Sequence, residues 1–321
     1  MIRLGILGCS EIAFRRFMPA AQKITGLNVI AVAEEYDKTK LQPFCQEYKI
    51  EGMESFDELI NRSDVDAVYV PQPPAFHYVW ARKALGAGKH VLIEKPSTTS
   101  LADSSDLVSL AKEKGLALHE NYMFQYHSQI SKIKEMLESG VIGDIRLYSA
   151  QFGFPMRSKN DFRYSKMLGG GALLDAGGYT LKLATIYLGN SIKVDSAKLN
   201  YLDGFEVDMY GNARLINDNG VVFNVAFGMD CGYRCSFEAW GSIGRLYTNR
   251  IFTAPDGYEP IVYIENNDGT KEVRLDTDSH FTTSISEFIS EISSEDKRHR
   301  MYDSILTQAR LVESVESVGK Q

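Results

Sequence analysis

The start of the chain decides its fold, through residues 1–13, MIRLGILGCSEIA. Ile2–Leu7 is a short apolar run that predicts a buried strand, and the apolar spacing over Ile12–Ile24 predicts a helix. Between them Gly8 permits a tight turn, and Ala13 is small enough for the helix to pack closely on the strand. The start of such a helix leaves N–H groups that bind anions. The segment therefore predicts a phosphate-binding turn.

The alternation of strand and helix continues to about residue 120. Short apolar or β-branched runs are separated by amphipathic stretches, which is the signature of βαβ units around a parallel sheet. The predicted strands are Ile2–Leu7, Asn28–Ala33, Ala67–Val70, His90–Ile93 and Leu116–His119, and the predicted helices are Ile12–Ile24, Lys38–Tyr48, His77–Ala87 and Leu101–Lys114. Residues 1–120 are thus expected to form an α/β domain with a doubly wound parallel sheet.

The pattern changes after a further predicted helix over Gln129–Ser139. Longer alternating runs then predict a large, mainly antiparallel open sheet, with Asn217–Gly220 as a hairpin loop. The predicted strands are Asp144–Phe154, Ile192–Tyr201, Val207–Ile216, Val221–Gly228 and Cys235–Trp240, interrupted by a helix over Ala172–Leu188. Residues 121–321 are expected to form an α+β domain for substrate binding and oligomerisation. Its last helix, over about 302–318, is a candidate to pack back on the first domain.

Composition narrows the class of protein. The 321 residues are 44% hydrophobic and 24% charged, without a secretory leader or an apolar run of about 18 residues that could span a bilayer, so a cytoplasmic protein is expected. The formal net charge of -7 and the lack of a basic cluster argue against nucleic acid as a partner. Cys231 and Cys235 are expected on one face of a strand, with no histidine nearby, so no metal site is predicted.

The turn after the first strand is an imperfect match to the dinucleotide-binding pattern G-x-G-x-x-G/A, because Ser10 replaces the second glycine. A serine is compatible if its hydroxyl points away from the pyrophosphate or donates to it. The second strand is followed by Glu34 and Glu35, where an acidic side chain binds adenosine ribose hydroxyls and repels a 2'-phosphate. These residues favour a Rossmann domain that binds NAD rather than NADP. A solvated turn is the alternative for the two carboxylates.

Three further motifs resemble one family. Residues 84–96, ALGAGKHVLIEKP, place Lys95 at the carboxyl end of a parallel strand, where open α/β sheets bind ligands. Residues 71–77, PQPPAFH, and 169–179, GGGALLDAGGY, lie on either side of it in the sequence. Together these motifs resemble the glucose-fructose oxidoreductase/inositol dehydrogenase (Gfo/Idh/MocA) family of nicotinamide-dependent oxidoreductases, whose E-K-P motif carries an active-site lysine. The resemblance spans nearly the whole chain, and it suggests a cis bond between Lys95 and Pro96.

The resemblance implies a catalytic centre of Lys95, Tyr179 and Asp175. Many family members have histidine where this chain has Tyr179, and the tyrosine is similar to that of sugar dehydrogenases and nucleotide-sugar 3-ketoreductases. A phenol with a pKa near 10 is a poor base unless a cation such as Lys95 stabilises the phenolate. Tyr179 is thus expected to exchange a proton with the substrate oxygen, while Asp175 bonds a sugar hydroxyl or orients Lys95. A helix-start carboxylate and a core aromatic are the structural alternatives.

Two glycines in the same helix need a reason, because each costs about 1 kcal/mol relative to alanine. Gly177 and Gly178 lie beside Tyr179, and this suggests that nicotinamide or substrate approaches the backbone there. Arginine suits diphosphate or carboxylate recognition, although Arg157 and Arg163 can also be surface charges. The expected cofactor contacts are Gly8, Cys9, Ser10, Glu11, Ile12, Glu34, Pro71, Gln72, Pro73, His77, Glu94 and Lys95. The expected substrate contacts are Asn121, Tyr122, Gln125, Arg157 and Arg163.

The expected reaction is hydride transfer between NAD, with NADP as the second choice, and a secondary alcohol or ketone of a sugar, in particular a nucleotide-linked hexose. A free-sugar or trans-dihydrodiol dehydrogenase is one alternative, and a non-catalytic NAD-binding regulator is another.

The strand Val221–Gly228 also suggests an assembly. Its residues 221, 223, 225 and 227 form an apolar face toward a helix, and the opposite face, with Asn224 on this strand and Trp240 on the next predicted one, is only partly polar. Exposure of such a face over several strands would leave an unusually large apolar patch, so a homodimer or homotetramer through this sheet is expected. Alternatively, charges such as Glu238 and Arg214 keep the face solvated.

Overall fold

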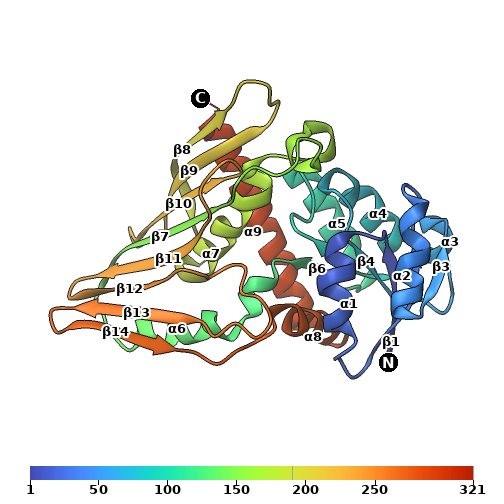
Figure 1. The fold of residues 1–321 in the computed structure, drawn as a ribbon, viewed down its shortest axis with the longest axis horizontal. Helices are drawn as coiled ribbons and strands as arrows, with labels where there is room; N and C mark the ends of the chain where they lie inside the picture. Colours follow the sequence, from blue (N-terminus) through green and yellow to red (C-terminus); the bar gives the residue numbers. More distant parts are fainter. Residues whose placement is uncertain (190, 321) are drawn as a thin grey trace. The chain divides into compact units, whose positions relative to one another are not determined.

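The computed structural model describes residues 1–189 and 191–320 (Figure 1). The chain divides into two compact units, one made of Met1–Asn121 and Phe281–Leu306, the other of Tyr122–His280 and Thr307–Gln321. Residues 281–306, late in the chain, thus belong to the first unit, including the start of the helix predicted over 302–318. In the described ranges, no helix is both long and apolar enough to cross a membrane.

The first unit is built on a six-stranded parallel sheet with the order β3-β2-β1-β4-β5-β6. Its strands are β1 (Ile2–Leu7), β2 (Leu27–Ala33), β3 (Glu51–Met53), β4 (Ala67–Val70), β5 (His90–Glu94) and β6 (Leu118–Asn121). The order reverses between β1 and β4, which is where doubly wound sheets open a ligand crevice at the carboxyl ends of their strands. Sequence reasoning missed β3, because this strand has only three residues and is largely exposed.

Each predicted helix of residues 1–120 overlaps an observed one, but the helices over Phe56–Ile60 and His280–Ser293 were not predicted. The helices of residues 1–120 are a π-helical turn η1 (Ala13–Phe17), α1 (Met18–Ala21), η2 (Lys38–Lys40), α2 (Leu41–Tyr48), α3 (Phe56–Ile60), α4 (Pro74–Gly86) and α5 (Leu101–Lys114). Late in the chain, α8 (His280–Ser293) and the first part of α9 (Glu295–Gly319) belong to the first unit, and the rest of α9 belongs to the second. Local signals fix some of the ends. In α5, Ser100 Oγ accepts from Asp103 N at 3.1 Å, and Gly115 ends the helix with a φ of 65°.

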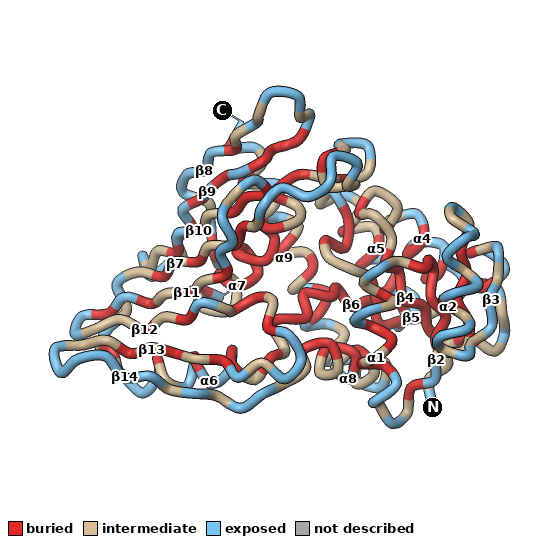
Figure 2. The backbone as a smooth tube through the Cα atoms, in the orientation of Figure 1, coloured by how far each residue is buried: buried red, intermediate tan, exposed pale blue. Residues whose placement is uncertain are grey.

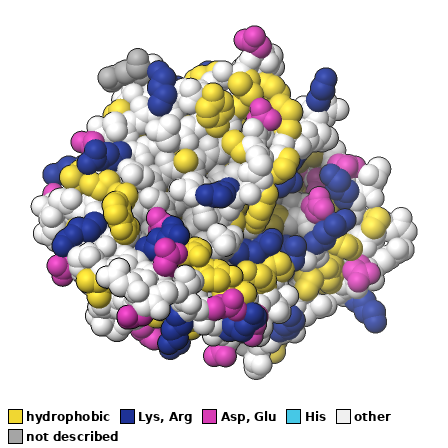
Figure 3. Space-filling view, turned by 60° about the vertical axis from the view of Figure 1, so that its left-hand side comes forward, with side chains coloured by type: hydrophobic (Ala, Val, Ile, Leu, Met, Phe, Trp, Pro, Cys, Tyr) yellow, Lys and Arg dark blue, Asp and Glu magenta, His cyan; other side chains and the backbone are white. Residues whose placement is uncertain are grey.

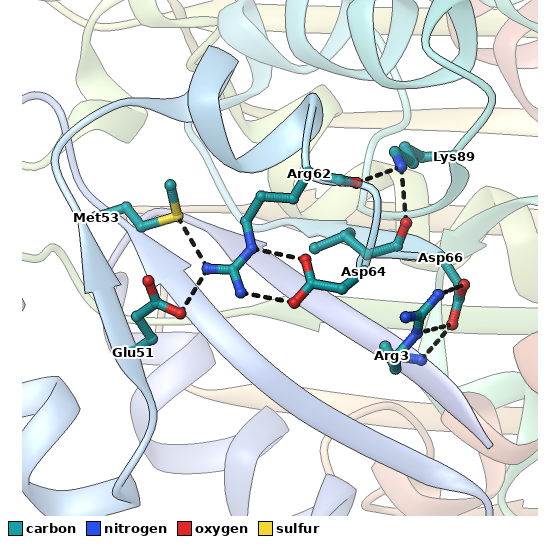
Figure 4. Close-up of polar contacts among 8 residues, drawn as sticks. Arg3, Glu51, Met53, Arg62, Asp64, Asp66 and Lys89 are labelled. Carbon is teal, nitrogen blue, oxygen red and sulfur yellow. Dashed lines mark hydrogen bonds and ion pairs between the residues drawn. The ribbon is translucent and has the colours of Figure 1, made fainter.

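Ion pairs connect residues at the amino-terminal edge of this sheet (Figure 4). Arg62 donates to both oxygens of Asp64, each at 2.8 Å, and Arg3 donates to both oxygens of Asp66. Lys89 Nζ donates to two backbone carbonyls that precede β4. Each of these partly exposed pairs stabilises the fold by about 1 kcal/mol or less. Their place at the amino edge leaves the carboxyl edge, where β1, β4 and β5 end, as the ligand side of the sheet.

The second unit is built on an eight-stranded sheet with the order β14-β13-β12-β11-β7-β10-β9-β8. All neighbours are antiparallel except β7 and β10, so the predicted mainly antiparallel sheet is confirmed. Its strands are β7 (Ile145–Gly153), β8 (Lys193–Tyr201), β9 (Asp208–Ile216), β10 (Val222–Gly228), β11 (Arg234–Gly241), β12 (Gly244–Thr248), β13 (Ile261–Asn266) and β14 (Gly269–Arg274). The last three were not predicted, since they are short and β14 is almost wholly polar.

One face of this sheet is buried against η6 (Leu173–Gly177) and α7 (Gly178–Leu188), which contact β7 and β10. Along β10, Phe223, Val225 and Phe227 are buried while Asn224 is exposed, an alternation that can be followed in Figure 2. The remaining helices of the unit include α6 (Ser128–Glu138). The predicted hairpin loop is confirmed between β9 and β10, where Asn217 N donates to Val221 O at 3.1 Å.

The expectation for the two late cysteines is wrong. Cys235 lies on β11 and is buried, whereas Cys231 lies before this strand begins at Arg234, so the two do not share a strand face. The Sγ of Cys235 accepts from Phe252 N at 3.3 Å, as a packed core thiol does.

Candidate active site

The turn after β1 needs glycine because another loop packs against it. Gly8 has a φ of 120°, and a Cβ added there would lie 1.9 Å from Nε2 of Gln72. The same Gln72 amide donates to Leu7 O. Ser10 Oγ accepts from Ala13 N at 3.2 Å, so the serine caps the first helical turn and still carries a proton to donate. The turn and the Gln72 loop therefore form one packed structure.

Glu34 joins the turn after β1 to the turn after β2. Its buried carboxylate accepts from Cys9 N at 2.7 Å through Oε2, and from Tyr36 N at 2.9 Å and Asp37 N at 3.1 Å through Oε1. Glu35 accepts from Phe56 N at 2.6 Å. Both acidic side chains thus hold backbone N–H groups, rather than only beginning a solvated turn.

His77 connects two of the predicted cofactor loops. The ring is fully buried, with Nδ1 2.7 Å from Pro96 O and Nε2 2.6 Å from Gln72 O. Burial lowers the pKa of His77 to about 4, against the effect of the two carbonyls, so the ring is neutral at pH 7 and its one N–H group donates to one of the two carbonyls. Because both ring nitrogens face the backbone, His77 holds the loops together instead of offering a group to a ligand. The bond between Lys95 and Pro96 is cis, as predicted.

Glu94 is held at the carboxyl edge of the first sheet by residues on the two neighbouring strands. Tyr69 OH on β4 and Asn121 Nδ2 on β6 both donate to its Oε1, each at 2.7 Å. Burial raises the pKa of the Glu94 carboxyl, while the two hydrogen bonds lower it. Three adjacent strand ends therefore converge on the carboxylate that immediately precedes Lys95.

In the second unit, Tyr179 lies in the first turn of α7 and is only 7% exposed. Its hydroxyl donates to Met123 Sδ at 3.7 Å. Aromatic rings surround it with centroid distances of 5.1 to 5.9 Å. These rings belong to Tyr122, Phe124, Phe152 and Phe252. The phenol thus lies in an apolar setting that fixes its orientation.

The two glycines before Tyr179 are explained by the chain itself. A Cβ on Gly178 would lie 2.1 Å from the hydroxyl of Tyr122, and one on Gly177 would lie 3.1 Å from Phe227 Cδ1. The expectation that nicotinamide or substrate occupies this space is therefore wrong, because packed side chains fill it.

Asp175 is paired with an arginine that we had assigned to the substrate. Arg163 Nε donates to Asp175 Oδ2 at 2.6 Å, and its Nη1 donates to Asp161 at 3.1 Å. Asp208 accepts from Leu173 N at 2.7 Å at the start of η6, and burial raises the pKa of Asp208 to about 6. Arg157 differs from Arg163, since it is exposed and lies 5.1 Å from the Phe154 ring centroid.

Comparison with known proteins decides the family. Residues 2–122 match a family model described as an oxidoreductase family with an NAD-binding Rossmann fold, and residues 130–247 match the Gfo/Idh/MocA C-terminal domain. The chain belongs to the Gfo/Idh/MocA family. This oxidoreductase is 40% identical to a dTDP-3,4-didehydro-2,6-dideoxy-alpha-D-glucose 3-reductase of Actinomadura kijaniata, over 98% of this chain and 94% of that one. The expected fold class, family and nicotinamide-dependent activity are confirmed.

A solved structure extends the likeness of this Gfo/Idh/MocA oxidoreductase to three dimensions. A 3-ketoreductase from Actinomadura kijaniata, in complex with NADP and TDP-benzene, matches with a TM-score of 0.95 at 39% identity, over 99% of this chain and 97% of that one. Variants of that ketoreductase with a tyrosine changed to phenylalanine, or a lysine changed to alanine, have also been solved.

The predicted substrate-binding residues of the oxidoreductase have different contacts in the structure. Asn121 donates to Glu94, and Tyr122 packs on Gly178 and Tyr179. Gln125 is different, because its Nε2 is buried without a hydrogen-bond partner among the described residues. Sequence reasoning missed Phe252, which lies far from Tyr179 along the chain and has no motif of its own. In the part of the chain that the structure describes, no three metal-ligating side chains come together.

Proposed function

We propose that this oxidoreductase reduces the 3-keto group of a dTDP-linked dideoxyhexose with a nicotinamide cofactor. The observation that carries the proposal is the 40% identity to the Actinomadura kijaniata 3-reductase over 98% of the chain. The likeness is not confined to the cofactor-binding half, and specificity in such enzymes depends on the half that binds the substrate. The TDP-benzene in the solved ketoreductase supports the same class of substrate.

A lysine and a tyrosine support the same chemistry. The lysine and tyrosine changed in the variants of the solved ketoreductase are separated by the same number of residues as Lys95 and Tyr179. We infer that Lys95 and Tyr179 are catalytic residues.

In the proposed reaction, Tyr179 transfers a proton and Lys95 supplies a positive charge. The bound cofactor supplies the hydride that the carbonyl carbon receives. Tyr179 gives its phenolic proton to the carbonyl oxygen, which becomes the new hydroxyl, and the phenolate then takes a proton from solvent. A phenol has a pKa near 10, so it is protonated at neutral pH and suits the direction of reduction. The Lys95 ammonium stabilises negative charge on the same oxygen.

We further propose that NAD is preferred over NADP, although the solved ketoreductase carries NADP. The Cys9, Tyr36 and Asp37 N–H groups, which could otherwise bind a phosphate, already donate to the Glu34 carboxylate. A 2'-phosphate in this region would meet the charges of Glu34 and Glu35 and gain no new donor.

Cofactor choice is tested by exchanging these charges. In the double variant Glu34→Ser with Glu35→Arg, three backbone N–H groups are released and a guanidinium is added, so the ratio of kcat/KM for NADPH to that for NADH should rise at least about tenfold. A Glu54→Ser variant, which changes an exposed acidic residue that pairs with Lys38, is the control. A wild-type enzyme that uses NADPH better than NADH contradicts the proposal.

Within the predicted substrate set, Arg157 is the best candidate for the diphosphate. Arg163 is already neutralised by Asp161 and Asp175, whereas Arg157 is exposed and forms no ion pair with the described residues. Arg157→Ala should raise KM for the nucleotide sugar about tenfold and leave KM for the cofactor unchanged. Arg310→Ala, which removes an exposed arginine from α9, is the control.

The proposed reaction is tested with purified enzyme, NADH and a set of dTDP-linked keto sugars, followed by NADH absorbance, with free sugars as the comparison. Tyr179→Phe should lower kcat about 10²- to 10⁴-fold. Tyr187→Phe is a matched control on α7, because the buried Tyr187 hydroxyl has no hydrogen-bond partner among the residues that the structure describes. Turnover of free sugars alone would favour a sugar dehydrogenase, and cofactor binding without any turnover would favour a regulator.

A further inference from the structure

Strand β6 ends in three consecutive polar residues, His119, Glu120 and Asn121, that are almost completely buried. Burying polar groups in the middle of a protein costs free energy unless they are hydrogen-bonded, and an apolar strand end would avoid that cost. The side chains of His119 and Asn121 reach α8, which lies far away in the sequence. These residues therefore need an explanation beyond packing.

A continuous series of hydrogen bonds runs from Glu94 into α8, and we call it the Glu94–Glu291 chain. Asn121 Nδ2 donates to Glu94, and Asn121 Oδ1 accepts from Ser284 Oγ at 2.8 Å. Ser284 Oγ lies 3.1 Å from His119 Nε2, and His119 Nδ1 lies 2.9 Å from Glu291 Oε1. Beyond Glu94, every member is at most 2% exposed.

The hydrogen bonds of the Glu94–Glu291 chain all run in one direction, which is set at the Glu94 end. The Asn121 amide turns its N–H group to Glu94 and its oxygen to Ser284. Ser284 donates its one hydroxyl proton to Asn121 Oδ1, so it must accept from a protonated Nε2 of His119. One proton is left between His119 Nδ1 and Glu291 Oε1. Each link thus holds the next in a single orientation.

We propose that Ser284, His119 and Glu291 are positioning residues, which fix the Asn121 amide and so orient the Glu94 carboxylate for the nicotinamide cofactor. The inference rests on the proposed function and on the expectation from the sequence that Glu94 is one of the cofactor contacts. Glu94 is suited to this role because both of its hydrogen bonds go to Oε1 and its side chain is partly exposed, so Oε2 can meet a ligand. The Glu94–Glu291 chain thus links buried residues of α8 to a carboxylate that binds the ligand. The three positioning residues do not touch the ligand themselves.

The decisive measurement is cofactor affinity in a Ser284 series, by titration of NADH fluorescence. Ser284→Ala removes the donor to Asn121 Oδ1 and should weaken NADH binding about five- to tenfold, which is the usual effect of one lost buried hydrogen bond. KM for NADH should rise equally, with kcat and KM for the sugar within about twofold. Ser284→Thr keeps a hydroxyl and should restore affinity. Ser286→Ala, on the exposed face of the same helix, is the matched control.

A double-mutant cycle separates positioning from a loss of stability. Glu94→Gln should itself weaken NADH binding, and in that background Ser284→Ala should add no more than about twofold. A variant that only loosens the fold would add its full effect in both backgrounds. Glu291→Gln, whose amide can donate to His119 Nδ1, should keep wild-type affinity, whereas Glu291→Leu should weaken it.

Two results would overturn the proposal in different ways. If Glu94→Gln weakens NADH binding but Ser284→Ala and Glu291→Leu do not, the chain has no positioning role while the proposed function stands. If Glu94→Gln leaves NADH affinity unchanged, the premise that Glu94 contacts the cofactor is wrong. Neither result depends on the identity of the sugar, because NADH binding is measured without it.

Discussion

Single side chains organise the cofactor side of the first unit. Glu34 fastens two turns through three backbone N–H groups, and His77 lies buried between two loops, with one ring nitrogen close to a backbone carbonyl of each. Neither residue needs to touch a ligand to matter for binding. Lys95 belongs to a different class, because its position after Glu94 at the end of β5 suits chemistry at the reacting oxygen.

We predict that Lys95→Met lowers kcat by at least about 100-fold while the dissociation constant for NADH stays within about threefold of the wild-type value. The reason is that the ammonium stabilises charge that develops only during the reaction. Steady-state kinetics and an NADH titration measure the two effects separately. Lys114→Met, at the exposed end of α5, is the control. Comparable turnover in Lys95→Met would remove this residue from the mechanism.

His77 predicts a pH dependence of stability. In the folded protein its pKa is lowered to about 4, while in the unfolded chain it is about 6.5, so the unfolded state binds more protons between these pH values. Lowering the pH from 6.5 to 4 should therefore reduce the free energy of unfolding by up to about 3 kcal/mol through this residue. Urea unfolding of wild type and His77→Gln across this range measures the difference. Parallel pH profiles for the two proteins would contradict the prediction.

At the scale of elements, the segment from η6 into α7 forms in spite of its glycines. Asp208 holds the N–H of Leu173 at its start, Arg163 holds Asp175 in its first turn, and Gln308 of α9 donates to Gly178 O at 2.8 Å. Tertiary contacts thus replace the helix propensity that glycine lacks. The gain is close packing of Tyr122 on the helix backbone beside Tyr179.

We predict that Gly178→Ala destabilises the protein by about 1–3 kcal/mol, although alanine is the better helix former. The added Cβ would lie 2.1 Å from the hydroxyl of Tyr122, which is fully buried and has no space to retreat into. The control is Gly86→Ala in α4, where a Cβ meets nothing within 4 Å and stability should stay equal or rise. Denaturant unfolding measures the free energy of unfolding of both variants. Equal values would show that Tyr122 moves aside at little cost in free energy.

At the scale of the whole molecule, the open face of the second sheet is only partly polar. Trp240 is 56% exposed there, and Arg245 forms ion pairs with Glu238 and Glu265. Arg214 pairs with Asp195 near the other end of the sheet. A space-filling view from the left-hand side of Figure 1 shows apolar side chains interspersed with charged ones (Figure 3). Exposed aromatic residues such as Trp240 are enriched at protein interfaces, whereas Glu and Asp are depleted there. The charged pairs on this face agree with the alternative of a solvated face.

We predict that this face pairs with a second copy of the chain, giving a homodimer or homotetramer. Trp240→Glu places a charge in the centre of the face and should shift the protein toward monomer at micromolar concentrations. Met167→Glu, which changes an 82% exposed residue outside the sheet, should leave the assembly intact. Sedimentation measures both. A wild-type protein that sediments only as a 36.0 kDa species would contradict the assembly and leave the catalytic proposals unaffected.

The sequence by itself determined the features that local chemistry controls. Strand and helix periods predicted β1, β4 and α5 with the bounds that the structure has, because buried strands and amphipathic helices leave their mark on consecutive residues. Gly8 predicted a phosphate-binding turn for the same reason, while the motif around Lys95 indicated a nicotinamide cofactor through its resemblance to the Gfo/Idh/MocA family. Short or polar strands such as β3 and β14 carry no such mark and were missed.

Only the tertiary structure decided what these residues touch. Ser284 meets Asn121 across more than 160 positions of sequence, and Phe252, in the loop after β12, meets Tyr179 on α7. Such contacts depend on where a returning helix or a distant loop packs, which no local period encodes. The same holds for Gly178, whose neighbour was expected to be a ligand and is the chain's own Tyr122, since a glycine records that something approaches closely and not what approaches.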